Sequence, residues 1–134
     1  MSPTETASPR IALVGPCGSG KSTLGHYLRA SGYEVRQPAQ EHSYVPNMWQ
    51  RLTHPDILIY LDLDFPTLLK RRPTNHGGPA RLQEQQLRLS HARAHCTFYL
   101  DTSNLTPEEV QARILAFLQS APLKPPPAPP GAAL

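Results

Sequence analysis

The chain has 134 residues, which is enough for one domain with a buried core, and its formal net charge is +3. Dedicated nucleic-acid-binding proteins usually carry a larger positive charge, so we expect no nucleic-acid partner. Two cysteines build no disulfide framework and no apolar run reaches the roughly 18 residues of a membrane span, so we expect a cytoplasmic protein without a membrane partner.

The first predicted elements are a polar arm, a strand and a helix. Residues 1–9 are rich in polar residues and proline, and we expect them to be a disordered arm. The continuous apolar run that follows indicates a buried strand over residues 10–14. Apolar residues then recur at helical spacing, which predicts a helix over residues 21–30.

A complete G-x-x-x-x-G-K-[ST] motif lies between this strand and this helix. The residues are Gly15, Pro16, Cys17, Gly18, Ser19, Gly20, Lys21, Ser22 and Thr23. Glycines let the backbone N–H groups approach phosphate oxygens, and a helix N-terminus favours negative charge. Lys21 can reach the β- and γ-phosphates and is a predicted catalytic residue, while the Ser22 hydroxyl can coordinate Mg²⁺. The motif therefore predicts that these nine residues bind the phosphates of a nucleotide.

A short alternating segment predicts a second strand over residues 33–37, and Glu41 follows it. A carboxylate at this place could accept a proton from an acceptor hydroxyl or hold Mg²⁺ through water. The alternative is a solvated loop residue, and His42 is a second candidate base. Trp49, further along, is either an aromatic wall of a substrate site or a core residue.

The strongest apolar run after the first predicts a third strand over residues 56–62. Asp62 ends this strand and is the expected carboxylate partner of Ser22 at the metal. The alternative is that this aspartate caps the helix expected over residues 65–72.

Three arginines flank a loop rich in glycine and proline. Arg71 and Arg72 end the third-strand helix, and Arg81 lies in a long helix expected over residues 80–95. Arginines beside a mobile segment suit a lid that closes over phosphates, so all three are candidate catalytic residues. An exposed basic helix face is the alternative.

The last predicted elements are a strand over residues 97–101 and a helix over residues 107–119 that begins with a capping box. The Pro-rich residues 121–134 are expected to be a disordered tail. This tail is either solvated or a ligand for a protein partner that reads proline.

Strands that alternate with helices predict an α/β fold. We expect three layers (α/β/α) around a mostly parallel sheet of about four to five strands, formed by residues 10–120. In such sheets the ligand lies at the carboxyl ends of the strands, where the loop, Glu41 and Asp62 would meet.

These segments resemble the P-loop NTPase superfamily, and in particular small kinases of the nucleoside, nucleotide and shikimate type. The loop at residues 15–23 is similar to their nucleotide loop, and residues 57–72 are similar to the segment that leads into their lid. Glu41 followed by Trp49 resembles a stretch of deoxynucleoside kinases in which the glutamate is the proposed base. The region between the second and third strands is shorter than in these kinases, which carry an additional helix and strand there.

The resemblance implies a P-loop NTPase fold and an ATP- and Mg²⁺-dependent phosphotransferase. The γ-phosphoryl group would pass to a hydroxyl or phosphate of an unknown small-molecule acceptor. The sequence contains no Asn-Lys-x-Asp guanine reader, which favours ATP over GTP. The alternative is a reduced nucleotide-binding module with a regulatory role toward a partner and slow or no hydrolysis.

Overall fold

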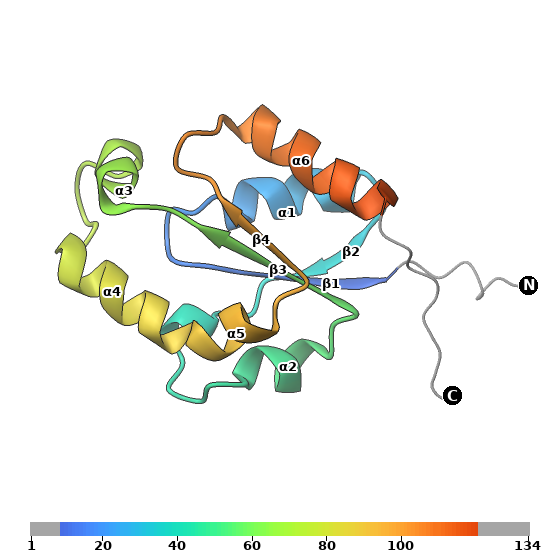
Figure 1. The fold of residues 1–134 in the computed structure, drawn as a ribbon, viewed down its shortest axis with the longest axis horizontal. Helices are drawn as coiled ribbons and strands as arrows, with labels where there is room; N and C mark the ends of the chain where they lie inside the picture. Colours follow the sequence, from blue (N-terminus) through green and yellow to red (C-terminus); the bar gives the residue numbers. More distant parts are fainter. Residues whose placement is uncertain (1–8, 121–134) are drawn as a thin grey trace, which may run out of the picture.

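The computed structural model describes residues 9–120 and has the predicted α/β architecture (Figure 1). The expected tail and all but the last residue of the expected arm lie outside the described residues. Within the described residues, four strands form one sheet in the order β2-β1-β3-β4, and every pairing is parallel. The strands are β1 (Arg10–Val14), β2 (Glu34–Arg36), β3 (Ile57–Asp62) and β4 (Phe98–Asp101).

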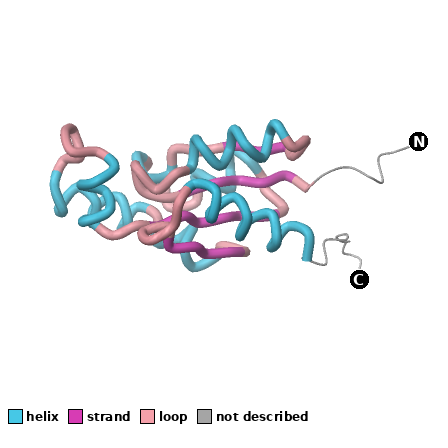
Figure 2. The backbone as a smooth tube through the Cα atoms, turned by 90° about the horizontal axis from the view of Figure 1, so that it is seen from above, coloured by secondary structure: helices cyan, strands magenta, loops and turns pink. Residues whose placement is uncertain are grey.

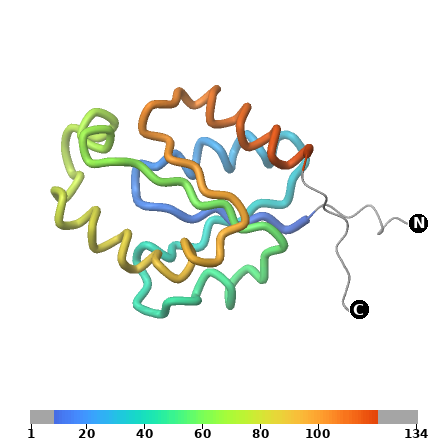
Figure 3. The backbone as a smooth tube through the Cα atoms, viewed as in Figure 1, coloured from blue at the N-terminus to red at the C-terminus, as the bar shows by residue number. Residues whose placement is uncertain are grey.

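In residues 9–120, six α-helices and the short 3₁₀ helix η2 surround the sheet, and Figure 3 follows their order along the chain. They are α1 (Lys21–Ala30), η2 (Gln40–His42), α2 (Met48–Thr53), α3 (Phe65–Arg71), α4 (Gly78–Arg88), α5 (Ser90–His95) and α6 (Pro107–Ser120). Between residues 9 and 120, none of these helices has both the length and the apolar character needed to cross a bilayer.

Helices cover both faces of the sheet, an arrangement compatible with three α/β/α layers (Figure 1 and Figure 2). On one face, α1 and α6 pack against alternate strand residues such as Leu13 and Ile59. On the other face, Trp49 of α2 and Ala92 of α5 pack against the intervening residues, such as Tyr60. Every residue of β3 is buried because a strand covered on both faces has no solvent side.

The order of the strands determines where the loops meet. The chain leaves β1 for β2 on one side and later returns to pair β3 with the other side of β1. All four strands run in the same direction, so their carboxyl ends lie at one edge of the sheet. Ligands of such sheets bind at this edge, beside the strand where the order reverses. Here that strand is β1, which leads directly into the glycine-rich loop.

The long helix predicted over residues 80–95 is wrong, because two helices meet at Leu89. Leu82 on α4 packs in a separate small cluster with Leu63 and Leu68 beyond the sheet edge. Leu89 and the helix that follows it pack under the sheet itself. One straight helix would not serve both clusters, so the chain bends between them. Helix α2 was not predicted, because its six residues show too little periodicity.

Candidate functional site

Glycine is required at two points of the loop between β1 and α1. A Cβ atom on Gly15 would overlap the backbone carbonyl oxygen of Leu61 on the neighbouring strand. Gly20 precedes α1 with a φ of 102°, a left-handed conformation that side chains with a Cβ rarely adopt. The loop therefore lies close against β3 and turns sharply into the helix.

The loop presents backbone N–H groups at the start of α1. Among the described residues, the N–H groups of Gly18, Gly20, Lys21 and Ser22 donate no backbone hydrogen bond. The first N–H groups of any helix have no carbonyl partner within it, and they form the positive end of its dipole. Such a loop and helix terminus can hold a ligand with several negative oxygens.

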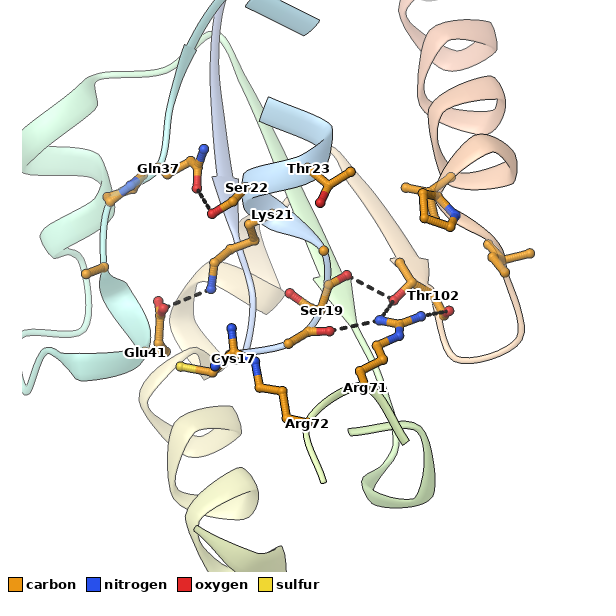
Figure 4. Close-up of a pocket in the computed structure, with 17 residues that line it drawn as sticks. Cys17, Ser19, Lys21, Ser22, Thr23, Gln37, Glu41, Arg71, Arg72 and Thr102 are labelled. Carbon is orange, nitrogen blue, oxygen red and sulfur yellow. Dashed lines mark hydrogen bonds and ion pairs between the residues drawn. The ribbon is translucent and has the colours of Figure 1, made fainter. Parts of the chain in front are cut away.

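Lys21 and Glu41 form a buried ion pair across the loop (Figure 4). Their Nζ and Oε2 atoms lie 2.8 Å apart, and the side chains are only 12% and 7% exposed. The Lys21 ammonium also donates to the carbonyl oxygen of Gly15 and, at 3.4 Å, to that of Pro16. The other carboxylate oxygen of Glu41, Oε1, is buried and has no hydrogen-bond partner among the described residues.

Gln40 fixes the position of Glu41. Its side chain is fully buried, accepts a hydrogen bond from the backbone N–H of Trp49 at 2.7 Å and donates to the carbonyl oxygen of Val45 at 2.8 Å. These bonds tie η2 to the start of α2. Trp49 itself is buried in the core rather than lining the pocket.

A pocket of about 580 Å³ opens beside the loop. Most of the loop, Gln37 after β2, Glu41, and Thr102 after β4 line it. Its wall on the α6 side is apolar and is formed by Leu105, Pro107 and Val110. Small-molecule sites usually have 300–1,000 Å³ of volume, an apolar wall and a few polar groups, and this pocket has the same character.

Arg71 and Arg72 both line this pocket, but they differ in their contacts (Figure 4). Arg71 donates to the carbonyl oxygen of Gly18 at 2.8 Å and to that of Thr102 at 2.6 Å. Burial lowers the pKa of Arg71, and the carboxylates of Asp101 and Asp64 oppose that shift. Arg72 is exposed. Arg71 thus ties the loop to the end of β4, whereas Arg72 is free to contact a ligand.

The structure does not bring Arg81 to the pocket. Arg81 lies in the first turn of α4 and lines a different, shallow surface with Glu84 and Leu87. Its aliphatic carbons instead lie against the backbone of Gly77.

Of the two predicted metal ligands, Ser22 lines the pocket and Asp62 does not. Both carboxylate oxygens of Asp62 accept hydrogen bonds: Oδ1 from Gln86 Nε2 at 3.1 Å and Oδ2 from the Tyr99 hydroxyl at 2.8 Å. Burial and the bond to Asp62 raise the pKa of Tyr99 to about 12. Burial together with the nearby Asp62 also raises the pKa of Tyr60. Asp64, rather than Asp62, caps the following helix through its bond to a backbone N–H of the first turn.

Two residues at the site were missed by sequence reasoning. Thr102 is fully buried, and its hydroxyl lies 3.0 Å from the carbonyl oxygens of Ser19 and Asp62. Gln85 of α4 accepts a hydrogen bond from the Cys17 N–H at 2.9 Å. Thr102 directly follows a predicted strand, a position that could have marked it; the glutamine sits in a helix among other polar residues and gives no such signal.

Comparison with protein families and with curated proteins gives no relative from which a role could be transferred. No protein-family model matches this chain, and no curated protein matches it either. The geometry of the site is therefore what indicates a function.

Proposed function

We propose that this chain has a P-loop NTPase fold and binds ATP with Mg²⁺, and that it transfers the γ-phosphoryl group to a hydroxyl or phosphate of a small-molecule acceptor. One observation carries the proposal: the glycine-rich loop joins a buried central strand to a helix N-terminus beside a pocket of about 580 Å³. The free N–H groups of the loop suit the phosphates, and the apolar wall near α6 suits a base.

Lys21 would exchange partners when nucleotide binds. In the structure its ammonium is held by Glu41 and the carbonyl oxygen of Gly15. Phosphate oxygens are strong alternative acceptors for it, and they carry more charge than one carboxylate. Glu41 would then be released to accept the proton of an acceptor hydroxyl while the oxygen of that hydroxyl attacks the γ-phosphorus. ADP leaves as the bond to the β-phosphate oxygen breaks.

Ser22 is the residue that we assign to the metal. Its hydroxyl lines the pocket and, within residues 9–120, makes only a long, 3.4 Å contact with Gln37, so it is available to an ion. Mg²⁺ would neutralise charge on the β- and γ-phosphates. Both oxygens of Asp62 already accept hydrogen bonds, so we give Asp62 no direct contact with the ion. Arg72 is the free cation for the transferring phosphoryl group, and Arg71 positions the loop.

Binding is tested by calorimetric titration of ATP with Mg²⁺ and, separately, with a chelator. Lys21→Met is expected to weaken Mg·ATP binding about 10- to 100-fold, the value of a charge-assisted hydrogen bond. Ser22→Ala is expected to remove most of the gain that Mg²⁺ provides while leaving metal-free binding unchanged. Ser90→Ala, at an exposed position on α5, is the matched control. A wild-type chain that binds no ATP under either condition would overturn the proposal.

Transfer is tested with γ-labelled ATP and a panel of nucleosides, nucleotides and small hydroxyl compounds. Label is expected to move to an acceptor in the wild-type chain and not in Glu41→Gln. ATP that stays intact with every acceptor contradicts transfer and leaves binding as a separate result.

A second candidate function is a nucleotide-binding module with a regulatory role and slow or no hydrolysis. The contact between α4 and the loop favours it, because Gln85 already occupies the Cys17 N–H. Arg88 of the same helix also donates to the backbone carbonyl oxygen of Glu41 at 3.4 Å, so α4 packs against both the loop and η2. Nucleotide-dependent association with a partner protein, without turnover, would distinguish this function from a kinase.

A further inference from the structure

We propose that Cys17, Glu41 and His42 form a binding site for Zn²⁺ or a similar borderline-soft divalent cation. Each residue offers one ligand atom, and these atoms all lie within 4.8 Å of one another. Within residues 9–120 this is the one group of three such side chains that lies close enough to share an ion. The site does not depend on the nucleotide function proposed above.

The spacing of the ligand atoms fits a tetrahedral ion. With Zn–S near 2.3 Å and Zn–N near 2.0–2.1 Å, a tetrahedral angle separates sulfur and nitrogen by about 3.6 Å. The Cys17 Sγ and His42 Nε2 atoms lie 3.6 Å apart. The same calculation with an oxygen near 2.0–2.2 Å separates nitrogen and oxygen by about 3.4 Å. His42 Nε2 and Glu41 Oε2 lie 3.8 Å apart, and the Cys17 sulfur lies within 4.8 Å of a Glu41 carboxylate oxygen. A tetrahedral ion separates sulfur and oxygen by about 3.6 Å, so rotation of the Glu41 and Cys17 side chains toward each other would complete the arrangement.

The surroundings of the cluster suit a bound cation. Gln85 Nε2 lies 3.4 Å from the Cys17 sulfur and donates to it, a contact that orients this ligand atom from outside the cluster. Glu41 brings a negative charge that is 93% buried by side-chain area, and its Oε1 atom has no hydrogen-bond partner among the described residues. A cation would stabilise this buried carboxylate.

Lys21 does not block the site. Its ammonium lies 2.8 Å from Glu41 Oε2, but it also has the carbonyl oxygens of Gly15 and Pro16 as acceptors. It can keep these bonds when the carboxylate binds a cation. Zn²⁺, a thiolate, a carboxylate and the lysine together carry one net positive charge, which the carbonyl oxygens and water can solvate.

The ligands come from two segments that the fold holds side by side. Cys17 lies in the loop after β1, and the other two residues lie in η2, which Gln40 ties to α2. The backbone that carries the three ligands is therefore in place before an ion arrives. The His42 side chain is 48% exposed, so an ion can enter from solvent and water can take the fourth position. On binding, the thiol proton of Cys17 passes to solvent as the sulfur–metal bond forms.

The donor set separates this site from a magnesium site. Mg²⁺ and Ca²⁺ prefer oxygen ligands, whereas sulfur and imidazole nitrogen select Zn²⁺ and Co²⁺. An excess of Mg²⁺ is therefore expected to leave a bound Co²⁺ ion in place, and Zn²⁺ is expected to displace it.

The experiment titrates the full, nucleotide-free chain with Co²⁺ and then with Zn²⁺. We expect one equivalent of Co²⁺ to give a sulfur-to-cobalt charge-transfer absorption, which Zn²⁺ removes, and one proton to be released per ion. Cys17→Ser and His42→Asn are each expected to weaken binding at least about 100-fold, since loss of an outer partner alone costs 10–100-fold. The charge-transfer band should be absent from Cys17→Ser at every Co²⁺ concentration.

Matched controls keep the result interpretable. Cys96→Ser removes the other free cysteine and His26→Asn removes an exposed histidine of α1, and both are expected to bind like the wild type. Binding that is absent, unchanged in Cys17→Ser and His42→Asn, or reversed by Mg²⁺ would overturn the proposal. The measurement contains no nucleotide, so its failure leaves the proposed ATP binding intact, and loss of ATP binding leaves this site intact.

Discussion

Removal of the lysine from the Lys21–Glu41 pair is expected to cost far more stability than removal of both charges. The two charged atoms lie 2.8 Å apart and the side chains are almost completely out of water. Lys21→Met leaves the carboxylate buried without its cation, and in the described part of the chain its Oε1 atom already lacks a hydrogen bond. An uncompensated buried charge of this kind costs about 3–5 kcal/mol. The double variant with Glu41→Gln buries no charge, so we expect it to lose only about 1–2 kcal/mol.

Urea unfolding without metal or nucleotide measures this difference. Trp49 is the sole tryptophan and is 5% exposed, so its fluorescence reports the loss of the core. With a denaturant slope near 2 kcal/mol per molar urea, Lys21→Met should lower the midpoint by about 1.5–2.5 M. The double variant should lower it by less than about 1 M. Lys70→Met, at an exposed position of α3, is the control and should stay within about 0.5 kcal/mol of wild type. If Lys21→Met costs no more than this control or the double variant, the desolvated pair is not what stabilises the loop.

Three further predictions concern the fold around the site. Asp64→Ala should lose about 1 kcal/mol at pH 7, because the capping bond that lowers the pKa of Asp64 is absent. A carboxylate whose pKa is lowered in the folded state contributes stability at pH values above its unfolded-state pKa, near 3.9. The difference in unfolding free energy between wild type and Asp64→Ala should therefore shrink as pH falls below about 4, and a constant difference contradicts this. Tyr99→Phe should lower the free energy of unfolding by about 1 kcal/mol at neutral pH, because one oxygen of Asp62 loses its hydrogen-bond donor. The pKa of Tyr99 is raised to about 12, so wild type should lose this advantage as pH rises from about 10 through 12, whereas an advantage that persists at high pH would refute the assignment. Gly15→Ala should lower the melting temperature more than Gly32→Ala, because a Cβ at Gly15 meets backbone whereas one at Gly32 meets open space; equal losses would contradict the close approach.

Much of the fold could be predicted because its signals are local. The four strands were recognised from short apolar runs, and each observed strand lies within one residue of its predicted ends. The capping box at Thr106 and Glu109 is present with both reciprocal hydrogen bonds. The bend at Leu89 could not be predicted in this way, because it depends on two clusters of residues that come from distant parts of the chain.

In the candidate site too, the local features could be predicted and the contacts between distant parts of the chain could not. Residues of the glycine-rich loop are consecutive, so the sequence could show them together. The positions of Asp62 and Arg81 in the chain predict that both lie near the loop. In the structure the side chain of Asp62 instead faces Tyr99 and Gln86. Arg81 faces solvent on α4. Which way a side chain points depends on its neighbours in three dimensions.

By itself the sequence determined the alternation of strands and helices, the parallel sheet and the glycine loop at the end of its first strand. These features follow from periodicity, turn residues and the steric needs of consecutive peptides. Only the tertiary structure decided that Lys21 pairs with Glu41, that Arg71 joins the loop to Thr102, and that Cys17 lies beside His42. Each of these contacts joins residues from different elements. The order of the strands and the burial of the helices bring those elements together, because the apolar faces can be removed from water only in that arrangement.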